Sequence, residues 1–103
     1  MYQVIKKLVR PSTDVAWPKY ADLADPTHLD YFDKNFSQPG KHIFRNNEEN
    51  PNGLDRTLTV LWESKEAYDE FMADTTMQKM AAHLAEIYAG LGITQELVSE
   101  SSI

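Results

Sequence analysis

The sequence predicts an α+β domain in which four strands form one antiparallel sheet and the helices pack on one of its faces. Three observations lead to this fold class. Period-two alternation marks four strand segments, and apolar residues at helical spacing mark two helical regions. The segments follow one another as strand, helix, strand, strand, helix, strand. With right-handed crossovers, this order gives the ferredoxin-like βαββαβ arrangement.

Length and composition fit a single domain that covers residues 1–103. A chain of 103 residues can bury one hydrophobic core but is too short for two domains. Hydrophobic residues make up 42% of it, which argues against disorder. A net charge of −6 disfavours nucleic acid or an anionic membrane surface as a partner, because phosphates are bound by basic surfaces.

The chain has no cysteine, which excludes disulfides, thiolate zinc sites and a cysteine nucleophile. No apolar run approaches the roughly 20 residues of a membrane-spanning helix. The first residues lack the pattern of a signal peptide. We therefore expect a cytoplasmic protein.

The first strand is predicted over residues 2–10, where apolar residues occur on both faces, and residues 11–14 end it. Residues 15–24 are ambiguous. Pro18 could begin a short helix, because proline is favoured at the first helical position. That helix would turn three residues inward: Tyr20, Leu23 and Ala24.

A clearer helix begins at Asp25 and Pro26, a capping carboxylate followed by a proline. Leu29, Phe32 and Phe36 follow at helical spacing, and the turn-forming residues 37–40 end the helix.

The second strand is predicted over residues 41–46, with His42 and Phe44 on one face and Ile43 and Arg45 on the other. Residues 47–53 are rich in turn formers and end in Asn-Gly, a strong hairpin signal. The third strand, over residues 54–62, has the most regular alternation in the chain.

The next helix is predicted to begin after Ser64, a favourable cap. A capping-box pattern over residues 75–78 predicts that the helix restarts there. The apolar stripe that follows is Met77, Met80, Ala81, Leu84, Tyr88 and Leu91.

Gly90 and Gly92 end this helix, and residues 93–99 alternate as a last strand. Residues 101–103 are predicted to be a frayed tail.

Apolar residues occupy both faces of the predicted sheet, as in the first strand, where Val4 and Leu8 oppose Ile5 and Val9. The helices cover only one face. Because an uncovered apolar face marks an interface, we expect a homodimer that packs sheet against sheet.

The segment from Trp62 to Phe71, Trp-Glu-Ser-Lys-Glu-Ala-Tyr-Asp-Glu-Phe, changes from strand to helix within two residues. Together with the element order, it resembles the antibiotic biosynthesis monooxygenase-like (ABM-like) family of the dimeric α+β barrel superfamily. The resemblance implies a homodimeric barrel with a pocket between the sheet and helices of each subunit. It also implies activities such as cofactor-independent oxygenation of polycyclic phenols, haem degradation, and roles in quinone or signal metabolism.

Two positions argue against haem degradation. The haem-degrading branch of the family has a tryptophan where this chain has Phe71, and a haem-ligating histidine where it has Ala81. His83 lies two positions later, roughly 200° further around a helix.

A candidate site follows from these patterns. Of the three histidines, His83 flanks the apolar stripe of the last helix and is the candidate catalytic base, since imidazole titrates near neutral pH. No local spacing offers three converging metal ligands. The candidate substrate-binding residues are Trp62, Tyr68, Phe71, Tyr88 and Arg56.

Each candidate also has a structural interpretation. Trp62 would pack in the core, and the histidines would be exposed to solvent. Arg56 shares a face with Leu58 and Trp62, so its charge needs a partner. An acidic side chain such as Asp55 is the default partner, and an anionic group of a substrate is the alternative.

Three functions remain open. The first is a cofactor-independent monooxygenase that acts on a small apolar or aromatic molecule, with neither a cofactor nor a metal. The second is a non-catalytic, small-ligand-binding or stress-associated homodimer of the same fold. The third is an interaction domain that uses the open sheet face for a different partner.

Overall fold

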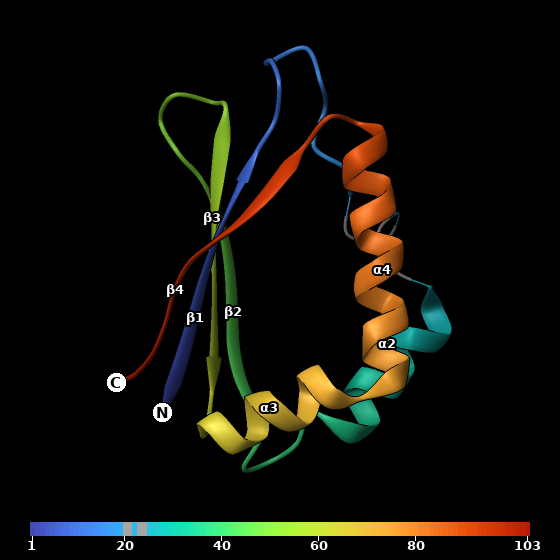
Figure 1. The fold of residues 1–103 in the computed structure, drawn as a ribbon, viewed down its shortest axis with the longest axis vertical. Coiled ribbons are helices and arrows are strands. Elements are labelled where there is room, and N and C mark those ends of the chain that lie inside the picture. The colour runs from blue at the N-terminus through green and yellow to red at the C-terminus, as the bar shows by residue number, and fades with distance from the viewer. Residues whose placement is uncertain (20–21, 23–24) are drawn as a thin grey trace.

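The computed structural model describes residues 1–19, 22 and 25–103, and it has the predicted α+β fold. A four-stranded antiparallel sheet is formed by β1 (Tyr2–Val9), β2 (His42–Glu49), β3 (Asp55–Trp62) and β4 (Thr94–Ser102), in the order β2-β3-β1-β4. The helices α2 (Pro26–Asn35), α3 (Lys65–Ala73) and α4 (Thr75–Gly90) lie on one side of the sheet (Figure 1). The βαββαβ order is confirmed. The possible helix carrying Tyr20, Leu23 and Ala24 lies outside the described residues.

The helix starts follow the predicted capping chemistry with one difference. The Asp25 carboxylate accepts a hydrogen bond from the Thr27 amide at 2.8 Å, and Ser64 Oγ accepts one from the Ala67 amide at 3.1 Å. The α4 helix is capped by Asp74, whose carboxylate accepts a hydrogen bond from the Met77 amide at 3.0 Å. The prediction of a cap at Thr75 was therefore wrong by one residue.

Two strands are longer than predicted. β2 continues to Glu49, because residues 47–49 pair with β3, and the turn is confined to the residues between the two strands. β4 continues to Ser102, which pairs with Tyr2. The prediction of a frayed tail over residues 101–103 was wrong, since the backbone amide of Ile103 also bonds to the carbonyl of Met1 at 2.9 Å.

The sheet and the helical layer meet through two separate groups of buried side chains. One group surrounds Trp62 and includes Tyr2, Phe36 and Met77; the other consists of Leu8, Tyr88 and Ile93. Between the two groups α4 stands away from the sheet (Figure 1).

The opposite face of the sheet is covered by no element that the structure describes (Figure 1). Phe44 on this side is 52% exposed, and Ile5, Val9 and Leu61 are half-buried. The face is therefore partly apolar, as the sequence predicted.

None of the described helices is both long and apolar enough to cross a membrane.

Candidate functional site

A cavity of about 330 Å³ lies between the sheet and the helices. Its wall is mainly apolar and comes from β1, β3 and all three helices, while Lys6, His42, Arg45 and Gln95 supply polar groups. The apolar wall includes Val4, Leu58, Val60, Phe32, Met80 and Leu84. A cavity of this size can hold a molecule of a few rings, or on the order of ten waters.

Four predicted site residues come together here. Trp62, Tyr68, Phe71 and Tyr88 all line the cavity. Trp62 ends β3, Tyr68 and Phe71 lie on α3, and Tyr88 lies near the end of α4. The strand-to-helix change after Trp62 thus brings aromatic side chains from two elements to one wall.

Trp62 belongs to the core and also lines the cavity. Its side chain is only 2% exposed, and its ring centroid lies 4.9 Å from that of Phe71 and 5.9 Å from that of Tyr68. The buried Nε1–H of Trp62 has no hydrogen-bond acceptor among the residues that the structure describes. Because a buried donor without an acceptor is costly, this N–H could bind an oxygen of a ligand.

Tyr68 can act as a hydrogen-bond donor but not as a base near neutral pH. Burial, reinforced by the negative charge of Glu100, raises the pKa of the Tyr68 hydroxyl to about 12. The hydroxyl therefore keeps its proton.

His83, the predicted catalytic base, is placed apart from the other candidates. It is exposed on α4 and is absent from the described walls of the cavity. On this helix Met80, Ala81, Leu84 and Tyr88 face the cavity. His83 directly precedes Leu84, and one residue rotates a helix by about 100°, so its side chain leaves that face.

His42 takes the place expected for His83. Its ring contacts Phe32 and Trp62 edge-on, with centroids 5.3 Å apart in both pairs. Burial, and secondarily the charge of Arg45, lowers the pKa of His42 below its usual value of 6.5. The imidazole is therefore neutral at pH 7 and can accept a proton. The expectation that this histidine is solvent-exposed was wrong.

A β-bulge brings His42 and Arg45 to the same cavity. His42 is paired with Trp62 and Arg45 with Val60, while the register shifts between His42 and Phe44. The extra residue, Ile43, breaks the alternation of β2. Strict alternation predicted His42 and Arg45 on opposite faces, and that prediction was wrong because of the bulge.

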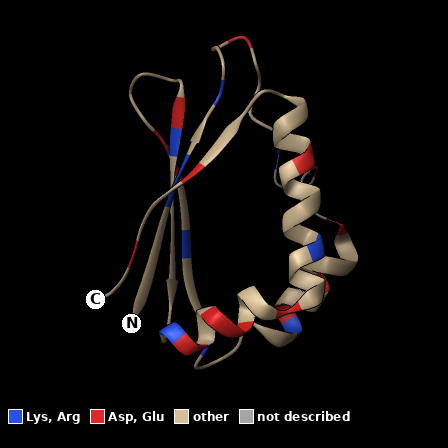
Figure 2. Cartoon of the chain, in the orientation of Figure 1, with Lys and Arg blue, Asp and Glu red and all other residues tan. Residues whose placement is uncertain are grey.

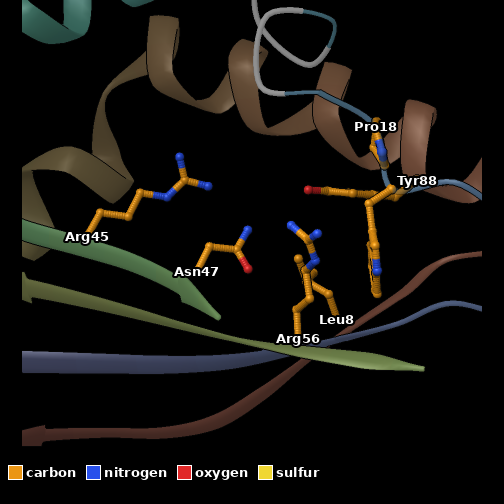
Figure 3. Close-up of a pocket in the computed structure, with 7 residues that line it drawn as sticks. Leu8, Pro18, Arg45, Asn47, Arg56 and Tyr88 are labelled. Atoms are coloured by element: carbon orange, nitrogen blue, oxygen red, sulfur yellow. The ribbon is translucent and has the colours of Figure 1, made fainter. Parts of the chain in front are cut away.

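A second compartment, of about 250 Å³, lies beside the cavity at the far end of the sheet. The two spaces share Leu8, Arg45 and Tyr88. Arg56, the fifth predicted binding residue, lines this compartment together with Trp17, Pro18 and Asn47. Figure 3 shows Arg45, Asn47, Arg56 and the Tyr88 hydroxyl pointing into the same space from β2, β3 and α4.

Arg56 is not held by the expected ion pair. Its guanidinium carbon lies 4.9 Å from the centre of the Trp17 ring, and no carboxylate that the structure describes forms a salt bridge with it. Asp55 pairs instead with Lys7, at 3.2 Å. No sequence pattern indicated that Trp17 would contact Arg56, since they lie far apart along the chain.

Trp17 is fixed in place by Arg10. The Arg10 Nε and Nη1 atoms donate hydrogen bonds to the carbonyls of Gly53 and Val15, at 2.8 and 2.9 Å. Trp17 Nε1 donates to Glu49 Oε1 at 3.2 Å, and the same oxygen accepts from Arg10 at 3.4 Å. The connection after β1 thus closes the second compartment.

No group of three His, Asp or Glu side chains among the described residues is arranged to hold a metal ion.

Comparison with known proteins identifies the fold. No protein-family model matches the sequence, and no curated protein matches it. The structure is similar to that of a single-site variant of SnoaB, a cofactor-independent oxygenase from Streptomyces nogalater. The TM-score is 0.62 at 12% identity, over 99% of this chain and 91% of SnoaB.

Two further structures agree. One is a predicted antibiotic biosynthesis monooxygenase from Deinococcus radiodurans. It matches with a TM-score of 0.61 at 12% identity, over 100% of this chain and 92% of that one. Rv0793 from Mycobacterium tuberculosis matches with a TM-score of 0.53 at 14% identity, over 100% and 98%. The chain therefore has the fold of antibiotic biosynthesis monooxygenase-type proteins, and identities this low establish the fold alone.

Proposed function

We propose that this protein is a cofactor-independent monooxygenase that oxidises a small, planar, apolar molecule bound in the cavity beneath Trp62. The observation that carries the proposal is the composition of that cavity. An apolar space of about 330 Å³ is lined by a neutral imidazole, that of His42, and by the ring of Trp62, whose buried Nε1–H has no acceptor among the described residues. The likeness of the fold to SnoaB, itself a cofactor-independent oxygenase, gives further support.

The chemistry requires a substrate whose carbanion is stabilised by a neighbouring carbonyl. His42 removes a proton from the substrate CH₂, and Trp62 Nε1–H donates a hydrogen bond to the enolate oxygen that develops. The carbanion reduces O₂ and forms a hydroperoxide, which loses water to leave a ketone. Overall, CH₂ and O₂ become C=O and H₂O, so the substrate itself supplies the electrons.

Oxygen uptake tests the proposal, with anthrone, a tricyclic ketone that has an acidic methylene, as the probe. We expect one O₂ to be consumed per anthrone. The rate of oxygen uptake should exceed the rate measured without protein. His42→Gln should lower kcat by roughly 10²–10⁴-fold, the usual contribution of a general base. His83→Gln is the matched control and should leave the rate unchanged. Equal losses in the two variants would refute the role of His42.

A second candidate is a non-catalytic ligand-binding protein with the same cavity. It is favoured by the absence of any side-chain hydrogen bond to His42 among the described residues, because catalytic bases are usually oriented by a third group. A thermal shift with phenols, quinones or anthrone, without oxygen uptake, would select this candidate.

The proposal includes a homodimer in which two open sheet faces pack together as an α+β barrel. Its support is the partly apolar face that contains Phe44, Ile5 and Leu61. Light scattering tests the assembly. A monomer in solution would favour the third possibility, an interaction domain with a different partner. The cytoplasmic location stays a prediction.

A further inference from the structure

We infer that the second compartment binds a carboxylate, so that the ligand of this protein is an aromatic acid. The apolar body of the ligand occupies the cavity beneath Trp62, and its carboxylate reaches the space between Arg45 and Arg56. The inference rests on the proposed function only in assuming that one small molecule fills both spaces.

Hydrogen-bond donors converge on the second compartment. Two guanidinium groups, the Asn47 amide and the Tyr88 hydroxyl point into one compartment (Figure 3). Burial raises the pKa of Tyr88, although the charges of Arg45 and Arg56 oppose this rise, and the hydroxyl stays protonated near pH 7. The compartment thus offers positive charge and neutral donors, a combination suited to an anion.

The charge around the two spaces is opposite in sign to that of the whole chain. The chain as a whole carries a net charge of −6. No carboxylate is among the described residues that line either space, whereas Lys6, Arg45 and Arg56 are. Acidic residues instead gather on the outer helices, as the red bands on α3 show (Figure 2). A cationic interior in an acidic protein is well suited to attract and hold an anion.

Arg56 has no carboxylate partner among the described residues. Its Nε atom is buried and has no acceptor within the part of the chain that the structure describes. Glu49 lies opposite Arg56 in the pairing of β2 with β3. The carboxylate of Glu49, however, accepts hydrogen bonds from Arg10 and Trp17. The Arg56 side chain also stacks on Trp17, an arrangement that fixes the guanidinium plane. A ligand carboxylate would supply the counter-charge that no described residue gives this guanidinium in a salt bridge.

The residues shared by the two walls indicate the class of ligand. Leu8, Arg45 and Tyr88 belong to the walls of both. An inorganic anion would fill only the polar end, whereas an acid with a planar apolar body would use both ends. The structure thus favours an aromatic carboxylate over free phosphate.

Paired ligands test the inference. Naphthoate and naphthamide have nearly the same shape but differ in charge, and both can be titrated by calorimetry with the intact protein. Because hydrogen bonds to charged groups are stronger than neutral ones, we expect naphthoate to bind at least about tenfold more tightly. Inorganic phosphate should compete only weakly. Equal affinity for naphthoate and naphthamide, binding of neither, or strong competition by phosphate would overturn the inference.

Variants locate the effect. Arg56→Met should abolish the preference for naphthoate and leave the affinity for naphthamide within about twofold. Lys34→Met is the matched control, since it removes the same charge from an exposed ion pair with Asp30 on α2. The Lys34→Met variant should still bind naphthoate more tightly than naphthamide. A variant of Arg56 that weakens both ligands equally would contradict the assignment.

The outcome is separable from that of the proposed function. A protein that prefers naphthoate but never consumes oxygen would refute the oxygenase and support the carboxylate site. Oxygen uptake with no preference for naphthoate would support the oxygenase and refute the carboxylate site. Far-ultraviolet circular dichroism of each variant verifies that the fold is kept.

Discussion

Two methionines one turn apart on α4 allow the cavity to be tested through stability alone. Met77 is 2% exposed and lies in the core around Trp62, whereas Met80 is half-buried and lines the cavity. Substitution by alanine removes the same atoms from both sites. Helix propensity favours alanine equally at both positions, so any difference reflects the surroundings.

The two substitutions should differ severalfold in cost. Met77→Ala loses the transfer free energy of a buried side chain and leaves a void in packed surroundings, about 2–5 kcal/mol together. Met80→Ala removes a half-buried side chain from the wall of an existing space. It loses roughly half of the 1.5–3 kcal/mol of full burial, or about 1 kcal/mol, and opens no new void. In a domain of this length each kcal/mol shifts Tm by roughly 4–8 °C.

Urea denaturation followed by circular dichroism measures both losses. The protein concentration must be equal in all samples, because dimerisation would add to the apparent stability. Equal losses for the two variants would show that side chains fill the space in solution. That result would refute the cavity and, with it, the proposed function.

Three further predictions concern other parts of the molecule. Asp74→Ala should cost about 1–2 kcal/mol, because Asp74 caps α4 and accepts a 2.6 Å hydrogen bond from the Tyr31 hydroxyl; Asp74→Asn should recover part of the loss in thermal melts. The folded pKa of His42 is below the unfolded value of 6.5, so the unfolded chain binds more protons between those two values. Stability should therefore fall as the pH drops below about 6.5, and His42→Gln should remove that slope; an unchanged slope contradicts the burial of the imidazole. Leu61→Lys, on the open sheet face, should give a monomer in light scattering, and a dimer that persists would place the interface elsewhere.

Local chemistry made much of the fold predictable. The carboxylate of Asp25 and the hydroxyl of Ser64 cap helices as their positions indicated, because a cap depends on residues within a single turn. The pairing of β1 with β3 runs without interruption, which suits the regular alternation of both strands. Signals of this kind are contained in a few neighbouring residues and can be identified in a sequence.

The candidate site was predictable in its aromatic half and, in its polar half, at Arg56. Trp62, Tyr68 and Phe71 are close in sequence, so their common wall followed from the strand-to-helix change. The polar half depends on contacts between distant segments. The bulge at Ile43 determines which face of the sheet Arg45 occupies. No sequence propensity of Ile43 predicts a bulge.

The two irregularities of the sheet have a consequence for aggregation. The extra residue of β2 is Ile43, and that of β4 is Val98, which the register with β1 skips. Both strands are the outer ones of the sheet, whereas the inner ladder is regular. A regular outer strand presents a continuous row of unpaired N–H and C=O groups to which another chain can add, and a bulge interrupts that row. The two bulges thus hinder the sheet from growing strand by strand into fibres.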